Sequence, residues 1–263
     1  MANNSKLSFA SWNIRWQSDE DIKNGDAWSK RFEPIADVIR FHDFDIVAIQ
    51  EGSVSKQADL APLLKDYTFI QTDSVEHNPI LIKTDMFEIL DKGRFYLSET
   101  PDKKSKGWDA MHKRYCVWAK LKRDNIVFFV FNTHFDHRGK VAKQESAKLI
   151  YQALPSIAEG NRFLLAGDFN STEGSIPYEI ITSNPQIKDA KDLAEFSYIP
   201  KKSFNFFKPM SYSKWDLDHI FVSPSIHVFR YGVLNETYYD GESYRYPSDH
   251  SPIMAVFEFS ATN

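Results

Sequence analysis

Short apolar runs of strand length recur along the chain, and several of them end on a polar group that can bind a metal or carry a proton. The groups that close the early runs are Asn13, Glu51, Asn132-Thr133-His134 and Asp168-Phe169-Asn170. Two late runs have the opposite polarity, because Asp218-His219 and Asp249-His250 stand before their apolar residues. If the late strands run antiparallel to the early ones, all six polar ends lie on one rim of the sheets. Such a rim is a candidate active site.

The same patterning predicts an α+β fold, an α/β sandwich of two packed sheets covered by helices. Alternating or continuous apolar positions predict strands over residues 7–12, 45–50, 67–71, 79–83, 87–97, 115–122, 126–133, 163–167, 219–223 and 253–259. Helical spacing predicts helices over 28–42, 140–158 and 174–183, with Pro34 kinking the first or starting its regular part. No repeat, low-complexity stretch or flexible linker divides the chain, so we expect one domain over residues 1–263.

Composition narrows the class of protein only a little. With 42% hydrophobic and 26% charged residues the chain has an ordinary globular balance, and its net charge of −4 gives no overall attraction to nucleic acid or anionic membranes. The single cysteine, Cys116, excludes an internal disulfide, so we expect a cytoplasmic protein, or a secreted or periplasmic one if a signal peptide has been removed. No apolar stretch reaches the roughly 18 residues of a membrane span, and we expect a monomer.

The polar strand ends are rich in the oxygen donors that a hard divalent cation prefers. Mg²⁺ usually takes one or two protein carboxylates and keeps several waters for the phosphate of a substrate. Glu51 is the best-placed carboxylate, and Asn13, Asp168, Asn170 and Asp249 carry oxygens that complete the site or place the phosphate. Each residue alone is more simply explained as a turn cap at a strand end. Six endings of one polarity are much harder to obtain by chance.

Two histidines, His134 and His250, also lie at predicted strand ends. A histidine oriented by a carboxylate can take a proton from water or neutralise a phosphate oxygen, although a lone rim histidine more often makes an ordinary hydrogen bond. Strand alternation predicts that His134 and His137 point to opposite faces. Zinc is not expected, because the chain has no Cys cluster and no helical His pair. The remaining histidines considered, which we expect to be surface or structural, are His42, His77, His112 and His227.

Taken together, the motifs resemble the endonuclease/exonuclease/phosphatase superfamily, which includes DNase I-like nucleases, abasic-site endonucleases, inositol polyphosphate phosphatases, deadenylases and neutral sphingomyelinases. In family order they are Ser11-Trp12-Asn13, Ile49-Gln50-Glu51, Asn132-Thr133-His134, Gly167-Asp168-Phe169-Asn170, Leu217-Asp218-His219-Ile220-Phe221 and Ser248-Asp249-His250-Ser251-Pro252. The segments 98–101, 107–110 and 132–139 look like a bacterial branch of it. The resemblance implies a four-layer sandwich: two mixed, mainly antiparallel sheets packed face to face and flanked by helices, with the site at one rim.

Carried over by position, the resemblance implies that Glu51 is the main metal ligand, with Asn13 beside it and Asp249 near the metal. It implies that Asp168 orients or deprotonates the attacking water and that Asn170 holds the phosphate or the metal's shell. The expected cofactor is Mg²⁺, with Mn²⁺ or Ca²⁺ as substitutes. The expected reaction is in-line attack of water on phosphorus.

On the phosphate side, the resemblance implies that His250 contacts the scissile phosphate while Asp218 pairs with its ring. His134 binds or protonates the phosphate, with Glu76 as its carboxylate partner. Arg114 matches a position that holds a phosphate-contacting Arg or Tyr in the family.

A basic stretch and an aromatic loop bear on the substrate. The basic residues, which either ring the site or form a solvated face, are Lys103, Lys104, Lys106, Lys113 and Arg114, with Arg138, Lys140, Lys201 and Lys202. The aromatic side chains of loop 204–215 either stack on bases or pack against the sandwich, and packing is the commoner outcome.

We therefore expect a metal-dependent hydrolase of phosphate esters, with a modest preference for a nuclease or another phosphodiesterase. The alternative is a phosphomonoesterase acting on a small metabolite such as a sugar, inositol or nucleotide phosphate. A catalytically inactive binding module is a remote alternative, because the set of acids with His250 is intact.

Overall fold

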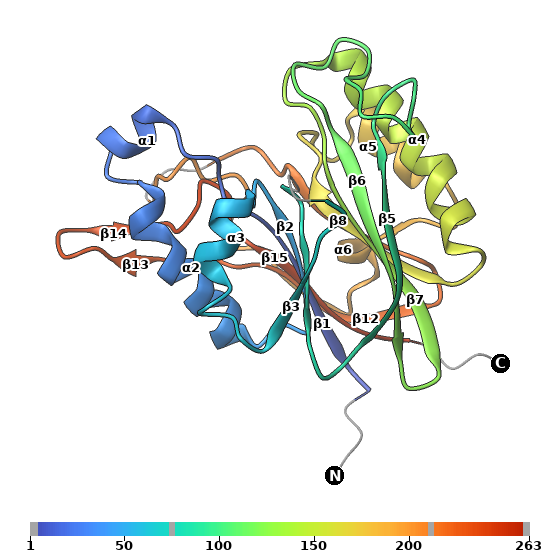
Figure 1. The fold of residues 1–263 in the computed structure, drawn as a ribbon, viewed down its shortest axis with the longest axis horizontal. Helices are drawn as coiled ribbons and strands as arrows, with labels where there is room; N and C mark the ends of the chain where they lie inside the picture. The colour runs from blue at the N-terminus through green and yellow to red at the C-terminus, as the bar shows by residue number, and fades with distance from the viewer. Residues whose placement is uncertain (1–4, 74–76, 210–212, 260–263) are drawn as a thin grey trace.

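Two central sheets form the core of the molecule (Figure 1). The computed structural model describes residues 5–73, 77–209 and 213–259. One sheet has seven strands in the order β10 (Phe196–Tyr198), β12 (Ile226–Val233), β15 (Ile253–Phe259), β1 (Leu7–Asn13), β2 (Ile46–Gln50), β4 (Ile80–Lys83) and β3 (Tyr67–Ile70). The other has six, in the order β5 (Glu88–Tyr96), β6 (Tyr115–Arg123), β7 (Ile126–His134), β8 (Arg162–Asp168), β11 (Asp218–Val222) and β9 (Lys188–Asp189). A small ribbon pairs β13 (Tyr238–Tyr239) with β14 (Tyr244–Arg245).

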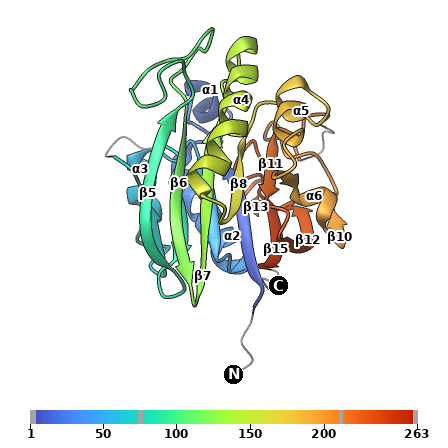
Figure 2. The same ribbon diagram turned by 90° about the vertical axis from the view of Figure 1, so that its right-hand side faces the viewer.

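Helices cover the outer face of each sheet, which completes four layers (Figure 1). Figure 2 shows α4 in front of the six-stranded sheet. Helices α2 (Trp28–His42) and α3 (Val54–Leu60) pack on the seven-stranded sheet, and α4 (Lys140–Ala158) and α5 (Ile176–Thr182) pack on the six-stranded one. Two short helices, α1 (Asp19–Lys23) and α6 (Ala190–Leu193), lie in connections. The strand pairs are antiparallel except β1–β2, β7–β8 and β10–β12. The predicted sandwich class and layer order are confirmed.

The largest cluster of buried apolar residues in the described chain lies between the two sheets. Phe9 and Ile46 from one sheet meet Val117 and Leu164 from the other, and all four are almost fully buried. Each large apolar side chain buried in this way contributes roughly 1.5–3 kcal/mol. None of the described helices is long and apolar enough to cross a membrane.

Strand direction brings the polar ends together as the sequence predicts. Strand β1 runs parallel to β2 and antiparallel to β15. Strand β7 runs parallel to β8, and β11 runs antiparallel to β8 so that Asp218 lies directly opposite Asp168. The ends of β1, β2, β7 and β8 and the beginnings of β11 and β15 therefore share one rim.

Several elements were not predicted from the sequence. Strand β12 escaped detection because a register shift between Val228 and Arg230 interrupts its alternation. Helix α3 escaped because its inward face carries the polar residues Lys56 and Gln57. Pro34 lies inside α2 and does not start it. The other unpredicted elements are short: α1, α6, β9, β10, β13 and β14.

A buried amide joins the two sheets just below the rim. The Nδ2 of Asn132 donates to the backbone carbonyls of Ile49 at 2.8 Å, Asn78 at 3.1 Å and Pro79 at 3.0 Å. Its Oδ1 accepts a 2.8 Å hydrogen bond from the side chain of Gln50. Since β7 belongs to one sheet and β2 to the other, this side chain fixes how the two halves of the rim meet.

The substitution Asn132→Leu should lower the free energy of unfolding by about 3 kcal/mol, because a similar volume is kept while the buried partners of the amide lose their hydrogen bonds. Urea denaturation measures the change. As a control, Asn161→Ala should cost less than about 1 kcal/mol, because Asn161 is half-buried just beyond the end of α4 and its amide donates only to the carbonyl of Ala158. Equal losses for the two variants would contradict the role of Asn132 as a joint between the sheets.

Candidate active site

The shared rim surrounds a cavity of about 940 Å³. The predicted site residues that line it are Asn13, Glu51, Arg114, His134, Asp168, Asn170, Asp249 and His250. Asp218 does not line the cavity but contacts the ring of His250 from behind. Glu76 lies outside the described residues, so its predicted pairing with His134 stays a prediction. The structure thus brings nine of the predicted residues into one site.

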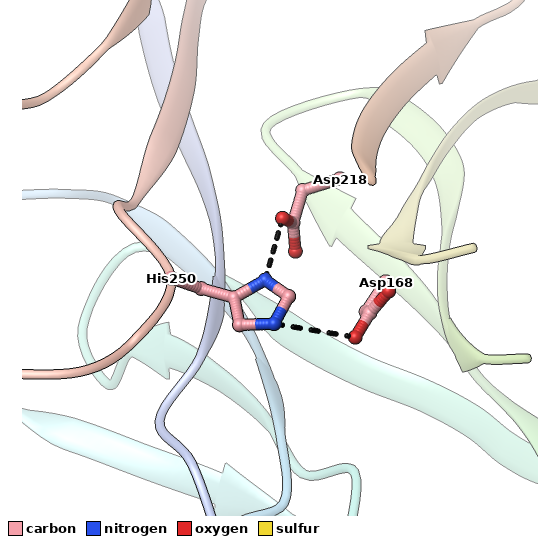
Figure 3. Close-up of side chains that lie close together, drawn as sticks. All are labelled: Asp168, Asp218 and His250. Atoms are coloured by element: carbon pink, nitrogen blue, oxygen red, sulfur yellow. Dashed lines mark hydrogen bonds and ion pairs between the residues drawn. The ribbon is translucent and has the colours of Figure 1, made fainter. Parts of the chain in front are cut away.

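His250 lies between two buried aspartates (Figure 3). Its Nδ1 is 2.7 Å from Oδ2 of Asp218, and its Nε2 is 3.7 Å from Oδ2 of Asp168. The chain around it is held in place, because Nε1 of Trp12 donates to the backbone oxygen of His250 at 2.9 Å. The ring of Phe204 packs against the imidazole with a centroid separation of 4.8 Å.

The pKa values of His250 and Asp168 are both raised, but for different reasons. Burial alone lowers the pKa of His250, but the carboxylates of Asp218 and Asp168 outweigh it and raise the pKa to about 10. Burial and the charge of Asp218 raise the pKa of Asp168, against the opposing charge of His250. At neutral pH, therefore, the imidazole carries a proton, and Asp168 is a stronger base than an exposed aspartate.

His134 approaches Asp168 from the neighbouring strand β7, with 3.4 Å between Nε2 and Oδ2. Burial, together with the charges of Arg114 and His250, lowers the pKa of His134 well below its ordinary value. Asn170 has a left-handed backbone with φ of 47°, and its N–H donates to Oδ1 of Asp168 at 2.9 Å. Asp168 is thus oriented by its neighbours on several sides.

Glu51 lines the cavity close to Asp168, because one nitrogen of Asn13 donates to both. Its backbone is also left-handed, with φ of 59° at the point where β2 ends. The Nδ2 of Asn13 donates to Oε1 of Glu51 at 3.2 Å and to Oδ2 of Asp168 at 3.0 Å, and the Trp16 N–H donates to Oε2 of Glu51. Burial raises the pKa of Glu51, but these hydrogen bonds outweigh it and the pKa falls below its ordinary value. Glu51 is therefore a stable carboxylate at neutral pH.

Three cationic side chains near Glu51 and Asp249 were not predicted from the sequence as part of the site. Nη1 of Arg15 pairs with Oδ2 of Asp249 at 3.0 Å. The ammonium of Lys56 donates to the backbone oxygens of Arg15 and Glu51. Arg31 is fully buried under the same loop, where it donates to backbone oxygens. Two of them, Arg31 and Lys56, lie among the buried residues of α2 and α3. A charged residue at a position that faces the core is the sequence signal that could have identified them.

The basic stretch contributes part of one wall. Lys104, Lys106, Lys113 and Arg114 line the cavity, whereas Lys103 does not. The other basic residues considered, which are also absent from the lining, are Arg138, Lys140, Lys201 and Lys202.

The sequence prediction for the other histidines was partly wrong. His134 and His137 line the same cavity, because β7 ends at His134 and strand alternation does not continue beyond it. His77 and His112 also line the cavity. The rings of His112 and His137 stack with a centroid distance of 5.6 Å.

In the described part of loop 204–215, some aromatic side chains pack against the sandwich and others remain exposed. Phe204 and Phe207 are half-buried against the molecule, and Phe204 also lines the cavity. Phe206 is 44% exposed and Trp215 is 52% exposed, so both remain accessible to a ligand.

The donor set of the cavity fits a hard divalent cation. Glu51, Asp168 and Asp249 supply carboxylate oxygens in one cavity, which is the chemistry that Mg²⁺ prefers. Asp168, Asp218 and His250 also place ligand atoms within 4.8 Å of one another. In that group, however, the protonated imidazole already supplies the positive charge, and Asp218 does not face the cavity. The carboxylates that face the cavity, Glu51, Asp168 and Asp249, are therefore the better candidates for a metal site.

A sequence model of the endonuclease/exonuclease/phosphatase family matches residues 10–250, and the chain belongs to this family. Its members are phosphoester hydrolases that generally depend on a divalent metal, so the chain is assigned to that class of enzyme.

Known structures share this fold over almost the whole chain. A mannosyl-6-phosphatase from Bacteroides thetaiotaomicron is 38% identical, with a TM-score of 0.93 covering 96% of this chain and 100% of that one. A family protein from Bacteroides vulgatus is 31% identical, with a TM-score of 0.88 covering 98% and 100%. Among sequence relatives, protein L388 of Acanthamoeba polyphaga mimivirus is 24% identical in an alignment 259 positions long, which covers 88% of this chain and 92% of the relative. These likenesses confirm the predicted family and fold.

The pairing in Figure 3 predicts how His250 titrates. Asp218→Asn should lower the pKa of His250 by about one to three units, because it removes the charge but keeps a hydrogen-bond acceptor. NMR of the ring in the metal-free chain measures this shift. A wild-type ring that titrates near its ordinary 6.5 would contradict the buried pairing.

The same pairing predicts a pH dependence of stability. Since the folded pKa lies above the ordinary value of 6.5, the stabilisation is complete below pH 6.5 and is lost as the pH rises towards 10. The metal-free wild type should lose more stability over this window than Asp218→Asn does, which denaturation at several pH values can measure.

Proposed function

We propose that this chain is a Mg²⁺-dependent phosphomonoesterase that acts on a small phosphorylated sugar. The observation that carries the proposal is the likeness, over 96% of the chain, to a mannosyl-6-phosphatase that is 38% identical. The cavity of about 940 Å³ supports it, because this volume lies within the range of sites that enclose small molecules.

In this proposal Glu51 is the principal Mg²⁺ ligand and Asp249 is the second carboxylate on the same side. Asn13 orients Glu51 and Asp168 relative to each other through its shared Nδ2. When bound, Mg²⁺ supplies Lewis-acid polarisation of the phosphoryl group and neutralises its charge. Arg15 pairs with Asp249, so part of the negative charge of Glu51 and Asp249 is already neutralised before a cation binds.

Asp168 is the residue proposed to accept the proton of the attacking water. Its raised pKa suits this role, because a base is most effective when its pKa lies near the working pH. The N–H of Asn170 and the amide of Asn13 hold its two oxygens in fixed directions.

His250 is proposed to donate a hydrogen bond from Nε2 to the phosphate. Its Nδ1 is committed to Asp218, and its raised pKa keeps Nε2 protonated at neutral pH. Because the pKa of His134 is strongly lowered, we propose that His134 binds the phosphate as a neutral ring. Arg114 and Asn170 complete the phosphate-binding set.

Phosphodiester cleavage is the second candidate, and the sequence alone gives it a modest preference. The exposed rings of Phe206 and Trp215 favour it, because such rings can stack on bases. Lys104, Lys106 and Lys113 in the cavity wall would meet neighbouring phosphates. The proposed catalytic residues would serve a phosphomonoester or a phosphodiester equally well, so these surrounding residues are what favour the second candidate.

Removal of the proposed base should abolish most of the activity. Asp168→Ala should lower kcat by about 10²–10⁴-fold with the fold intact, because general base catalysis usually contributes that much. Phosphate release from mannose 6-phosphate, with and without EDTA, is the measurement. Activity that survives EDTA or Asp168→Ala would contradict the mechanism.

The metal assignment has its own test. Glu51→Gln should raise the Mg²⁺ concentration needed for half-maximal activity by about tenfold or more, because a charged oxygen ligand is lost. Glu88→Gln, at an exposed position on β5, is the control and should leave the Mg²⁺ dependence unchanged. A Glu51→Gln variant with an unchanged Mg²⁺ curve would sink the assignment.

A direct comparison of esters decides between the two candidates. Mannose 6-phosphate, other sugar phosphates, bis(p-nitrophenyl) phosphate, single-stranded DNA and RNA are assayed side by side with Mg²⁺. The proposal predicts the highest kcat/KM for a sugar phosphate. Cleavage of nucleic acid without release of phosphate from any sugar would establish the second candidate instead.

A further inference from the structure

Asp136 is a buried carboxylate next to the site that the proposed reaction does not use. It is 1% exposed, it follows β7 by two residues, and it is absent from the lining of the cavity. Removing an ionised carboxylate from water is costly unless charges or hydrogen bonds compensate for it. The groups that surround Asp136 therefore show what it holds.

Four backbone N–H groups donate to this one carboxylate. Met111 and His112 donate to Oδ2, each at 3.0 Å. Arg138 and Gly139 donate to Oδ1, at 2.9 Å and 2.8 Å. Burial alone would raise the pKa of Asp136, but these four bonds outweigh it and lower the pKa far below the ordinary value. The carboxylate thus joins two chain segments: one before β6 and one before α4.

The segment before β6 carries much of the cationic wall. The long connection between β5 and β6 supplies the cavity-lining residues Lys104, Lys106, Met111, His112, Lys113 and Arg114. Oδ2 of Asp136, the oxygen that binds Met111 and His112, also lies 3.8 Å from Nε of Arg114. Among the described residues, Nε of Arg114 has no hydrogen-bond partner, and Asp136 is the carboxylate within ion-pair distance of it. The charges of Glu51 and Asp168 also act on the guanidinium.

We propose that Asp136 is a positioning residue that holds Arg114 and the segment 111–113 against the phosphate end of the cavity. A connection of this length loses conformational freedom when it is ordered, and one carboxylate with four donors offsets that loss at the point where the phosphate would bind. Arg114 contacts the phosphate, and Asp136 acts through Arg114. The inference rests on the proposed phosphate site but not on the identity of the ester.

Binding of inorganic phosphate to the Mg²⁺-loaded chain tests the inference without hydrolysis. Asp136→Asn keeps the size of the side chain, but its amide nitrogen faces N–H groups that need an acceptor. The variant and Arg114→Met should each raise the Kd of phosphate by about tenfold or more, because each breaks a charge-assisted contact. The double variant should bind no more than about twofold worse than Arg114→Met alone, since the two residues act as one unit.

Asp109→Asn is the matched control. Asp109 also accepts two backbone N–H bonds, from Val141 at 3.2 Å and Ala142 at 2.7 Å, but it does not line the cavity. Its replacement should leave the Kd of phosphate unchanged. An Asp136→Asn variant with wild-type phosphate affinity, or factors that multiply fully in the double variant, would overturn the inference.

Amide hydrogen exchange provides a second measurement that needs no variant. In the wild-type chain, one carboxylate accepts the N–H groups of Met111, His112, Arg138 and Gly139. These four amides should therefore become exposed to solvent in the same opening event and show similar protection from exchange. Four unrelated exchange rates would refute the anchor even if Asp136→Asn failed to fold. Failure of the proposed function alone would appear differently, as intact phosphate binding and common exchange without release of phosphate from a sugar.

Discussion

The burial of His250 between Asp218 and Asp168 is the interaction on which the site depends. The antiparallel pairing of β8 with β11 places the two aspartates opposite each other, both almost fully buried. Two carboxylates in such surroundings cost several kcal/mol each unless a positive charge compensates for them. The protonated imidazole supplies that charge, and the hydrogen bond to Asp218 leaves Nε2 facing Asp168 and the cavity. One arrangement therefore fixes both the protonation state and the direction of the ring.

The other charged residues of the rim form one acidic group and one cationic group. Glu51 and Asp249 form the acidic group, which is braced by Arg15 and Lys56. Another part of the wall is cationic, and Asp136 accepts backbone N–H bonds from Met111 and His112 in that segment. A phosphate ester placed between the two groups would meet the proposed Mg²⁺ on one side and hydrogen-bond donors on the other, which is the arrangement that an anionic transition state needs. The strained backbones of Glu51 and Asn170, both with positive φ, lie next to this boundary.

Much of this could be predicted from the sequence, since strand polarity follows from where apolar runs begin and end. That pattern, with the family resemblance, identified the sandwich and eight residues of the cavity lining. The pattern of apolar and polar positions did not predict residues whose placement depends on contacts between distant parts of the chain. Lys56 and Arg31 are buried because the loop before α1 offers backbone oxygens to them, a tertiary fact that no local pattern contains. His137 faces the cavity because the strand stops before it. Two of the four N–H groups that donate to Asp136, those of Met111 and His112, lie more than twenty residues away in the chain.

The central claim is that the rim is a metal-dependent phosphoesterase site with the cation beside Glu51. The most direct test is the anomalous scattering of Mn²⁺ in crystals of the wild-type chain grown with Mn²⁺ and phosphate. We expect a single strong Mn²⁺ peak in the cavity within bonding distance of a Glu51 oxygen, and none inside the Asp168–Asp218–His250 group. A peak bound by Asp218 and His250, with Glu51 uncoordinated, would show that the metal site is elsewhere.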